Sequence, residues 1–291
     1  MQLIPFDNRD GFIWMNGKTI KWNEAKIHVL NHGLHYGSCV FEGIRIYEKK
    51  IFKLKEHVKR LFHSAKVLDL NIPFSVSEIT NFVQEIVFKQ NIQNGYIRPV
   101  VWRGSEIMAI SSKNGSTNIA IAAWKWPSYF SPEQILKGIK MTTSKWSRPS
   151  PSSAPTDSKA AGLYMICSLS KHKAESQGFD DALMLDYRGF IAEATGANIF
   201  FIKEKKLFTP KADCFLNGIT RKTVIEIARK LKIPVKEDHF KPEFMKECDE
   251  AFLTGTAVEI TPIRSIDQFS FKSRNLTKIL IDEFKKLINQ Y

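Results

Sequence analysis

The stretch HGLHYGSCVFEGIR, residues 32–45, says more about fold and function than any other part of the chain. Its second half opens the segment VFEGIRIY at 40–47, which predicts a β-strand. His32 and His35 have a spacing that fits neither HExxH nor another paired zinc motif. We expect them to be structural histidines near a turn, and we expect no metal site in the chain.

Outward from this stretch, the first 125 residues alternate between helical and strand patterns, which predicts an α+β unit. Residues 12–22 predict a β-hairpin with Asn16 and Gly17 at its turn. Ser75 and Glu78 form a capping-box pattern, which marks a helix start. Two helices and two buried strands are expected at about 54–70, about 76–91, 97–102 and 118–124.

The second half of the chain predicts further helices around a β-meander. The Ser/Pro-rich segment 147–157 predicts a loop, after which Lys159 opens a helix that ends near 177. Later elements are expected at 181–209 (meander), 217–231 (helix), 250–256 (strand) and around 276–288 (helix). A chain of 291 residues exceeds the usual size of one hydrophobic core, so two domains are expected.

Composition and charge are those of an ordinary globular protein. Hydrophobic residues make up 43% of the chain, and no apolar run approaches the roughly 18 residues of a membrane span. The N-terminus lacks a signal-peptide pattern, so we expect a cytoplasmic location and free thiols at all four cysteines. The net charge of +13 allows nucleic-acid binding, but the basic residues are dispersed, which favours a solvated surface and no nucleic-acid or membrane partner.

Four short patterns could carry chemistry. Lys159 at a helix start would have a lowered pKa, as a Schiff-base amine needs, although an exposed lysine is the commoner case. Glu193, in an apolar strand pattern, either serves a ligand cation or points to water from an edge strand. Gly218 and Thr220 could hold an anion at a helix start, or Thr220 could cap that helix. The segment 254–257 offers a second anion site or an ordinary turn.

As a set, these patterns resemble the fold-type IV pyridoxal-phosphate (PLP) enzymes and, within them, the branched-chain amino-acid aminotransferases. The resemblance extends over nearly the whole chain. The matching stretches are HGLHYGSCVFEGIR at 32–45, EHVKRLFHSAK at 56–66, YIRPVV at 96–101, SKAAGLY at 158–164, IAEATGANIF at 191–200, LNGITR at 216–221 and TGTAVEITPIRS at 254–265. The D-amino-acid aminotransferases and aminodeoxychorismate lyases of the same fold differ in the first stretch and stay as alternatives.

The resemblance implies a mixed α+β and α/β fold with two domains. A smaller N-terminal α/β sandwich would span 1–125, an interdomain linker 126–136, and a larger pseudo-barrel domain with Lys159 would span 137–291. It also implies a homodimer, which could assemble further into a hexamer of dimers. The implied reaction is transamination of L-leucine, L-isoleucine and L-valine with 2-oxoglutarate.

The resemblance assigns cofactor roles residue by residue. Lys159 would form the covalent aldimine with PLP and move the substrate proton. Glu193 would pair with the pyridine nitrogen, Tyr164 with the phenolic oxygen and Arg60 with the phosphate. The remaining phosphate contacts would come from Gly218, Ile219, Thr220 and Thr256.

Substrate roles follow from the same resemblance. Thr256 and Ala257, with Tyr96, would bind the α-carboxylate, and Arg98 would meet the distal carboxylate of glutamate. An apolar wall for the side chain would come from Phe41, Trp126 and Tyr129. Contacts to the partner subunit's site are expected from Tyr36, Met108 and Ile110. The sequence departs from the family pattern at Leu163, at Ala197 and in the charged loop 103–110, which leaves substrate preference open.

Overall fold

The computed structural model describes residues 4–126 and 130–290, which divide into two compact units. The first unit comprises Met1–Pro127 and Ser158–Gly162, and the second comprises Ser128–Asp157 and Leu163–Tyr291. Lys159 therefore groups with the first unit, although the sequence around it belongs to the second. The expected linker over 126–136 includes residues 127–129, which lie outside the described residues.

Seven antiparallel strands form the sheet of the first unit. Six lie in the order β2-β1-β7-β6-β4-β5, and β3 pairs with the end of β6 that β4 leaves open. The predicted hairpin is confirmed, with Met15 opposite Lys18 and Asn16 in the left-handed region at φ 48°. The strands are β1 (Phe12–Met15), β2 (Lys18–Lys21), β3 (Cys39–Phe41), β4 (Ile44–Tyr47), β5 (Lys50–Ile51), β6 (Gly95–Arg103) and β7 (Thr117–Lys125).

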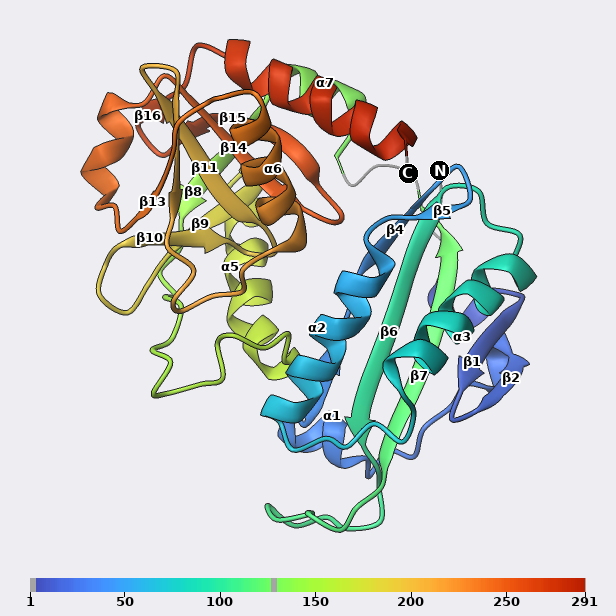
Figure 1. Cartoon of the computed structure of the whole chain (residues 1–291). Coiled ribbons are helices and arrows are strands. Elements are labelled where there is room, and N and C mark those ends of the chain that lie inside the picture. Colours follow the sequence, from blue (N-terminus) through green and yellow to red (C-terminus); the bar gives the residue numbers. More distant parts are fainter. Residues whose placement is uncertain (1–3, 127–129, 291) are drawn as a thin grey trace. The chain divides into compact units, whose positions relative to one another are not determined.

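Two helices, α2 (Leu54–Val67) and α3 (Val76–Lys89), pack along this sheet (Figure 1). Both lie close to the predicted ranges, and the predicted capping box at the start of α3 is present. Ile97 of β6 is buried in the core that the sheet shares with these helices. Arg98 follows it and points to the opposite face of the sheet, since side chains alternate along a strand. The unit also contains α1 (His32–Tyr36), η1 (Phe6–Asn8) and η2 (Trp22–Glu24).

The single strand predicted over 40–47 is wrong, because the chain breaks at Glu42 and Gly43 between β3 and β4. A Cβ at Gly43 would lie 1.8 Å from Tyr96 Oη, so a larger residue cannot fit there without movement. The Glu42 amide donates to the Pro99 carbonyl at 2.9 Å, and the Glu42 side chain is completely buried. The break thus places a carboxylate inside the first unit.

Nine strands form the sheet of the second unit, in the order β10-β9-β8-β15-β14-β11-β12-β13, with β16 beside β15. Because β10 also pairs with β11, the path from β10 to β11 closes on itself, which confirms the predicted pseudo-barrel. The strands are β8 (Ile139–Thr143), β9 (Asp181–Leu185), β10 (Ile191–Ala194), β11 (Asn198–Lys203), β12 (Lys206–Pro210), β13 (Val235–Asp238), β14 (Glu250–Gly255), β15 (Glu259–Ile266) and β16 (Phe269–Ser270).

The helix predicted from Lys159 begins later than expected. A 3-10 turn, η3 (Ala161–Leu163), precedes α5 (Tyr164–Ser176). Lys159 itself is in an extended segment, because Ala160 bridges to Val40 of β3. No described helix is long and apolar enough to cross a bilayer. The other helices of this half are α4 (Pro132–Lys137), α6 (Ile219–Lys230), η4 (Pro242–Glu247) and α7 (Asn275–Gln290).

Candidate active site

Lys159 is held in the first unit by its backbone. Its amide donates to Ser64 Oγ of α2 at 2.9 Å, and its carbonyl accepts from the Phe41 amide at 3.2 Å. Burial, assisted by the nearby charge of Arg60, lowers the pKa of Lys159 to about 8. The expected cause, a helix N-terminus, is wrong, and desolvation replaces it. A neutral amine, which nucleophilic and base chemistry require, is therefore accessible near neutral pH.

A buried ion-pair network lies near Lys159 and joins Glu42 to α2. Arg60 donates from Nε to Glu42 Oε1 at 2.6 Å and from Nη2 to Oε2 at 2.9 Å. His57 Nδ1 lies 2.8 Å from the same Oε2. Burial alone would raise the pKa of Glu42, but Arg60 and His57 outweigh burial and hold this pKa well below its usual range.

Sequence reasoning identified Arg60 but missed its buried partner Glu42 and the His57 that contacts the same carboxylate. A signal was available, because His57, Arg60 and Ser64 follow one another at spacings of three and four residues and so share one face of α2. Glu42 gave no such signal, since it was assigned to the interior of a continuous strand.

Four of the expected substrate residues gather on the sheet face opposite the helices. The Arg98 guanidinium lies 4.6 Å from the Phe41 ring centroid and 5.5 Å from that of Tyr96. The Tyr96 and Trp126 ring centroids are 5.5 Å apart. Arg98 Nε and Trp126 Nε1 are buried without a hydrogen-bond partner in the described part of the chain. Buried donors in this condition indicate a place for a ligand's acceptor atoms. Tyr129 lies outside the described residues.

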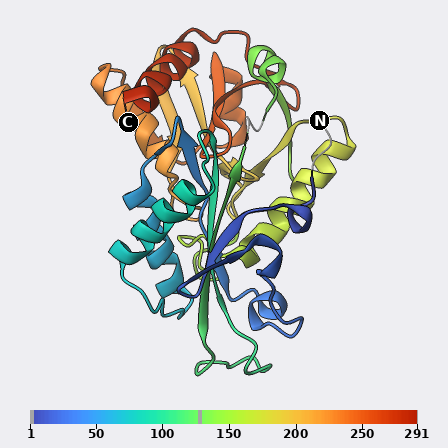
Figure 2. The ribbon, with the colours of Figure 1, turned by 90° about the vertical axis from the view of Figure 1, so that its right-hand side faces the viewer.

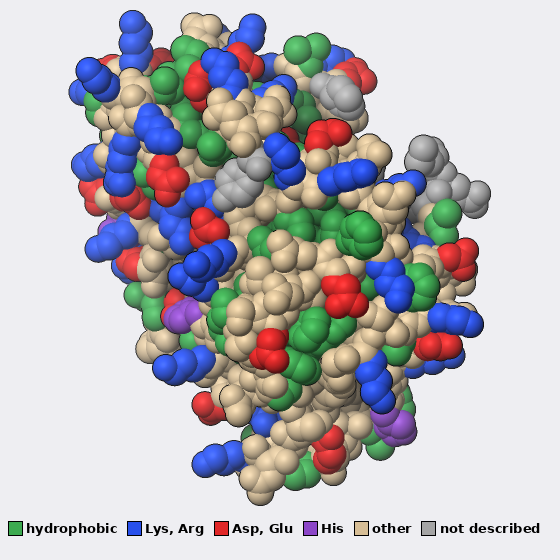
Figure 3. All heavy atoms as spheres, turned by 45° about the vertical axis from the view of Figure 1, so that its right-hand side comes forward, with side chains coloured by type: hydrophobic (Ala, Val, Ile, Leu, Met, Phe, Trp, Pro, Cys, Tyr) green, Lys and Arg blue, Asp and Glu red, His purple; other side chains and the backbone are tan. Residues whose placement is uncertain are grey.

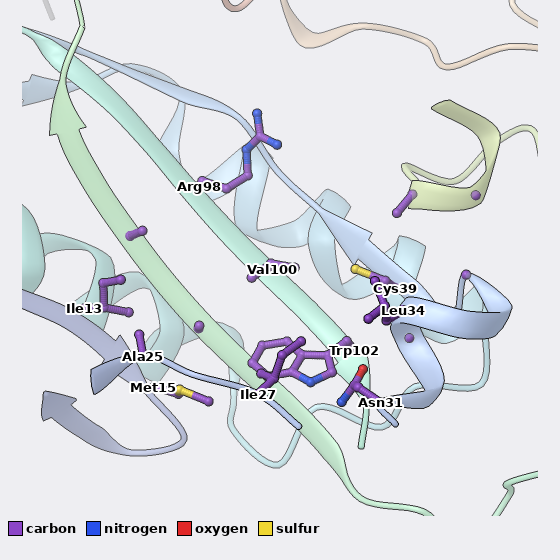
Figure 4. A pocket seen from close by; sticks show the side chains of 16 residues that line it. Ile13, Met15, Ala25, Ile27, Asn31, Leu34, Cys39, Arg98, Val100 and Trp102 are labelled. Carbon is purple, nitrogen blue, oxygen red and sulfur yellow. The ribbon is translucent and has the colours of Figure 1, made fainter. Parts of the chain in front are cut away.

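Arg98 also lines a cavity of about 590 Å³ in the first unit (Figure 4). Its walls are mostly apolar and include Cys39, Val100 and Trp102. Arg98 and Trp102 lie at separate levels along β6, so the cavity follows the strand. The exposed face of this sheet therefore combines an apolar hollow with the arginine expected to meet a substrate carboxylate.

Glu193 lies in the second unit and does not point to water from an edge strand. Its strand β10 pairs on both sides, and the residue is 8% exposed. The cationic partner that its sequence neighbours lack is Arg148, whose Nε lies 3.3 Å from Glu193 Oε1. Burial alone would lower the pKa of Arg148, but the charge of Glu193 outweighs burial and raises this pKa. Sequence reasoning could not have found this pair, because it joins distant segments.

Asn198 connects Glu193 to the start of α6. Its Nδ2 donates to Glu193 Oε2 at 3.1 Å and to the Leu216 carbonyl at 3.0 Å, while its Oδ1 accepts from the Gly218 amide at 3.1 Å. A Cβ at Gly218 would lie 2.2 Å from Asn198 Oδ1, so this position requires glycine. Gly218 is the N-cap of α6, and the alternative in which Thr220 caps the helix is wrong.

The amide groups in the first turn of α6, at Ile219 and Thr220, form an electrostatic environment suited to an anion. Thr256 and Ala257 lie in the tight turn between β14 and β15 and are half-buried. Thr254 Oγ1, just before that turn, is buried without a hydrogen-bond partner among the described residues. Tyr164 is half-buried at the start of α5.

The expected site residues thus fall into two groups. The first unit holds Tyr36, Phe41, Arg60, Tyr96, Arg98, Trp126 and Lys159, and the second holds Tyr164, Glu193, Gly218, Ile219, Thr220, Thr256 and Ala257. On the molecular face in Figure 3, Lys and Arg side chains are interspersed with Asp and Glu. The basic residues on this face are therefore dispersed, as they are along the sequence.

Comparison with known proteins identifies the family. The model of the amino-transferase class IV family matches residues 39–266. A "probable branched-chain-amino-acid aminotransferase" of Rickettsia felis is 42% identical over 294 residues, which cover 100% of both chains. The branched-chain-amino-acid aminotransferase of Escherichia coli is 38% identical over 262 residues, which cover 88% of this chain and 85% of that protein.

Solved structures give the same result. The crystal structure of the branched-chain amino acid aminotransferase of Escherichia coli superposes with a TM-score of 0.93 at 36% identity, covering 96% of this chain and 95% of that one. The branched-chain amino acid aminotransferase of Thermobaculum terrenum, solved in its PLP form, has a TM-score of 0.87 at 30% identity, covering 96% and 94%. The chain therefore belongs to the amino-transferase class IV family.

Proposed function

We propose that the chain is a PLP-dependent branched-chain amino-acid aminotransferase, which moves the amino group of L-leucine, L-isoleucine or L-valine to 2-oxoglutarate. Family membership and the names of its relatives support the reaction class. The observation that carries the chemistry is Lys159, a half-buried lysine whose pKa is lowered to about 8 by desolvation beside Arg60.

The residues present fit PLP. Lys159 offers a neutral amine for the cofactor's aldehyde, and Glu193 offers a buried anion for its pyridine nitrogen. The first turn of α6 would offer N–H donors to a phosphate, and Arg60, whose Nε and Nη2 edge is held by Glu42, would present the remainder of its guanidinium. At Gly218 the missing Cβ lets the backbone amide donate to Asn198 Oδ1 at 3.1 Å, which holds the start of α6 in place.

When bound, PLP supplies an electron sink for the negative charge that develops at the substrate α-carbon. The chain's own residues do the rest. Lys159 Nζ accepts the α-proton and later returns it. The negative charge of Glu193 would keep a proton on the pyridine nitrogen, and Tyr164 would donate to the phenolic oxygen.

Substrate recognition would use both polar and apolar residues. The backbone amides of Thr256 and Ala257, with Tyr96, would hold the α-carboxylate. Phe41 and Trp126 would exclude water from a branched aliphatic side chain. Arg98, whose buried Nε lacks a hydrogen-bond partner in the described chain, would bind the distal carboxylate of glutamate.

The same proposal includes a homodimer. Tyr36 is 46% exposed and Ile110 is 83% exposed, although both are large hydrophobic residues. Exposed residues of this kind are typical of an interface. Ile110 lies in the loop between β6 and β7, which extends beyond the ends of those strands (Figure 2). We expect these residues and Met108 to approach the partner subunit's site. Light scattering of the purified protein tests this assembly, and a dimer or a hexamer of dimers is expected.

An absorption spectrum of the purified protein with PLP tests the function. We expect a cofactor band that shifts when L-leucine is added and returns when 2-oxoglutarate is added. Lys159→Ala should lose this response, whereas Lys173→Ala, which changes an exposed lysine on α5, should keep it. A band that ignores L-leucine but answers D-alanine would replace the proposal with a D-amino-acid aminotransferase. The absence of any band would exclude PLP chemistry.

A further inference from the structure

Glu42 lies in the break between β3 and β4, where it is completely buried and its side chain is held by several hydrogen bonds. It is 0% exposed, its backbone amide is held by the Pro99 carbonyl, and its own Oε2 also accepts from the Gly43 amide at 3.2 Å. A Cβ on the neighbouring Gly43 would displace Tyr96, because Tyr96 Oη occupies that space. Both the backbone and the side chain of Glu42 are therefore fixed before any ligand binds.

The pairing between Glu42 and Arg60 sets the direction of the guanidinium. Glu42 engages the Nε and Nη2 edge of Arg60 with both carboxylate oxygens. Guanidinium groups are planar, so a bidentate contact along one edge fixes the plane and directs Nη1 away from the carboxylate. Arginine side chains are flexible when they are unpaired. The bidentate contact with Glu42 removes most of the rotational freedom of Arg60 before a ligand binds.

His57 completes the support. It is 1% exposed, lies one helical turn before Arg60 on α2, and has its Nδ1 2.8 Å from Glu42 Oε2. Burial lowers the pKa of His57, although Glu42 acts against this, so the ring is neutral and donates through Nδ1–H. One carboxylate thus receives two donors from Arg60 and one from His57, and all of these donors belong to one face of one helix.

We propose that Glu42, supported by His57, is a positioning residue that orients Arg60 toward the phosphate group of PLP. The inference rests on the proposed function, because Arg60 is assigned to the phosphate there. The Glu42–Arg60 ion pair carries no net charge as a whole, so phosphate binding would depend on the direction of the N–H donors more than on charge alone. Neither Glu42 nor His57 would touch the cofactor or the substrate.

The test compares the binding of PLP with that of pyridoxal, which lacks the phosphate. The variants are Glu42→Gln, Arg60→Ala and the two together, with Glu56→Gln as the matched control, because Glu56 is exposed on the same helix. Glu42→Gln should weaken PLP binding by about tenfold or more and leave pyridoxal binding within about twofold. In the Arg60→Ala background, the same change should have little further effect.

His57 provides a second and milder test should Glu42→Gln fail to fold. His57→Asn retains an N–H donor near the position of Nδ1, and His57→Leu does not. Asn should preserve the preference for PLP over pyridoxal, whereas Leu should reduce it by about threefold to tenfold. This rescue by a donor separates orientation of Arg60 from simple packing.

Four results would overturn the inference. Equal weakening of PLP and pyridoxal by Glu42→Gln would show a general structural role. An undiminished effect in the Arg60→Ala background would show that Glu42 does not act through Arg60. If the unchanged protein binds no PLP, the proposed function fails and the inference fails with it, whereas normal PLP binding with an indifferent Glu42→Gln removes the inference alone.

Discussion

In each unit, a carboxylate near the candidate site residues lies buried beside an arginine, but the Glu42–Arg60 and Glu193–Arg148 pairs are built differently. In the first unit, Arg60 reaches both oxygens of Glu42 at 2.6 and 2.9 Å, and His57 adds a third side-chain donor. In the second unit, Arg148 Nε lies 3.3 Å from Glu193 Oε1, and a neutral amide, Asn198, contacts the other oxygen at 3.1 Å. The first pair is short and bidentate, while the second is longer.

This difference separates two uses of a buried charge. A carboxylate whose oxygens take short contacts from a planar cation fixes that cation in place. A carboxylate held by longer contacts keeps its negative charge in a defined position and remains suited to a ligand cation. Glu42 therefore fits a structural and positioning role, and Glu193 fits a role in the reaction.

The largest expected effect is a difference in how much the Glu42–Arg60 and Glu193–Arg148 pairs contribute to the free energy of unfolding. Glu42→Ala should lower the free energy of unfolding by about 3–5 kcal/mol, because it leaves a buried guanidinium without its bidentate partner. Glu193→Ala should cost less, since its contacts are longer. Urea unfolding of the cofactor-free proteins measures both. An equal loss at Glu193, or a greater one, would contradict the distinction.

The second prediction concerns the pH dependence of stability that Lys159 gives to the first unit. The pKa of Lys159 is about 8 in the folded chain, against an ordinary value of 10.5, so the unfolded chain binds more protons between these values. The stability of the cofactor-free protein relative to Lys159→Met should therefore rise by about 3 kcal/mol from pH 8 to pH 10.5. Unfolding of both proteins across this range measures the difference. Lys173→Met, at an exposed position, should show none.

The third prediction addresses activity. Glu193→Gln keeps the shape of the side chain but removes the negative charge, so kcat should fall by a factor on the order of 10². The exposed Glu175, on α5, provides the control substitution Glu175→Gln. Steady-state kinetics with L-leucine and 2-oxoglutarate decide the matter. An unchanged kcat in Glu193→Gln would remove this residue from the reaction.

The smallest effect on ligand binding is expected at Gly218, whose amide Asn198 connects to Glu193. Gly218→Ala would place a Cβ 2.2 Å from Asn198 Oδ1 and displace the Gly218 amide. PLP binding should weaken by about tenfold, because donors at the start of α6 would be misplaced. Pyridoxal binding serves as the internal control and should change much less. Similar losses for the two ligands would indicate a general distortion of the second unit.

Most regular elements of the fold could be predicted from the sequence, because local periodicity decides them. The hairpin at Asn16, the helix that Ser75 caps and the strands of the meander depend on residues close to one another. Two predictions failed where distant residues decide. The strand over 40–47 breaks where the Glu42 amide bonds the Pro99 carbonyl and Tyr96 Oη fills the space beside Gly43, and Lys159 is extended because its segment pairs with β3.

The candidate site residues, too, could be predicted from the sequence only where a local pattern or the family resemblance identified them. Lys159, Arg60 and Glu193 could be selected from local patterns and from the family resemblance. Their partners could not, since Glu42 lies 18 residues from Arg60 along the chain, and the contact between Glu193 and Arg148 also joins distant segments. Contacts of this kind depend on the tertiary fold, which no local pattern encodes.

The position of Lys159 also has a consequence for the order of events during synthesis. The bond from its amide to Ser64 spans 95 residues, so the ribosome completes the rest of the first unit before this segment emerges. Chains fold as they are made, and contacts of long sequence separation form late. We expect the 158–162 segment, with Lys159, to dock against a nearly complete first unit, as a late step in folding rather than as part of the folding nucleus.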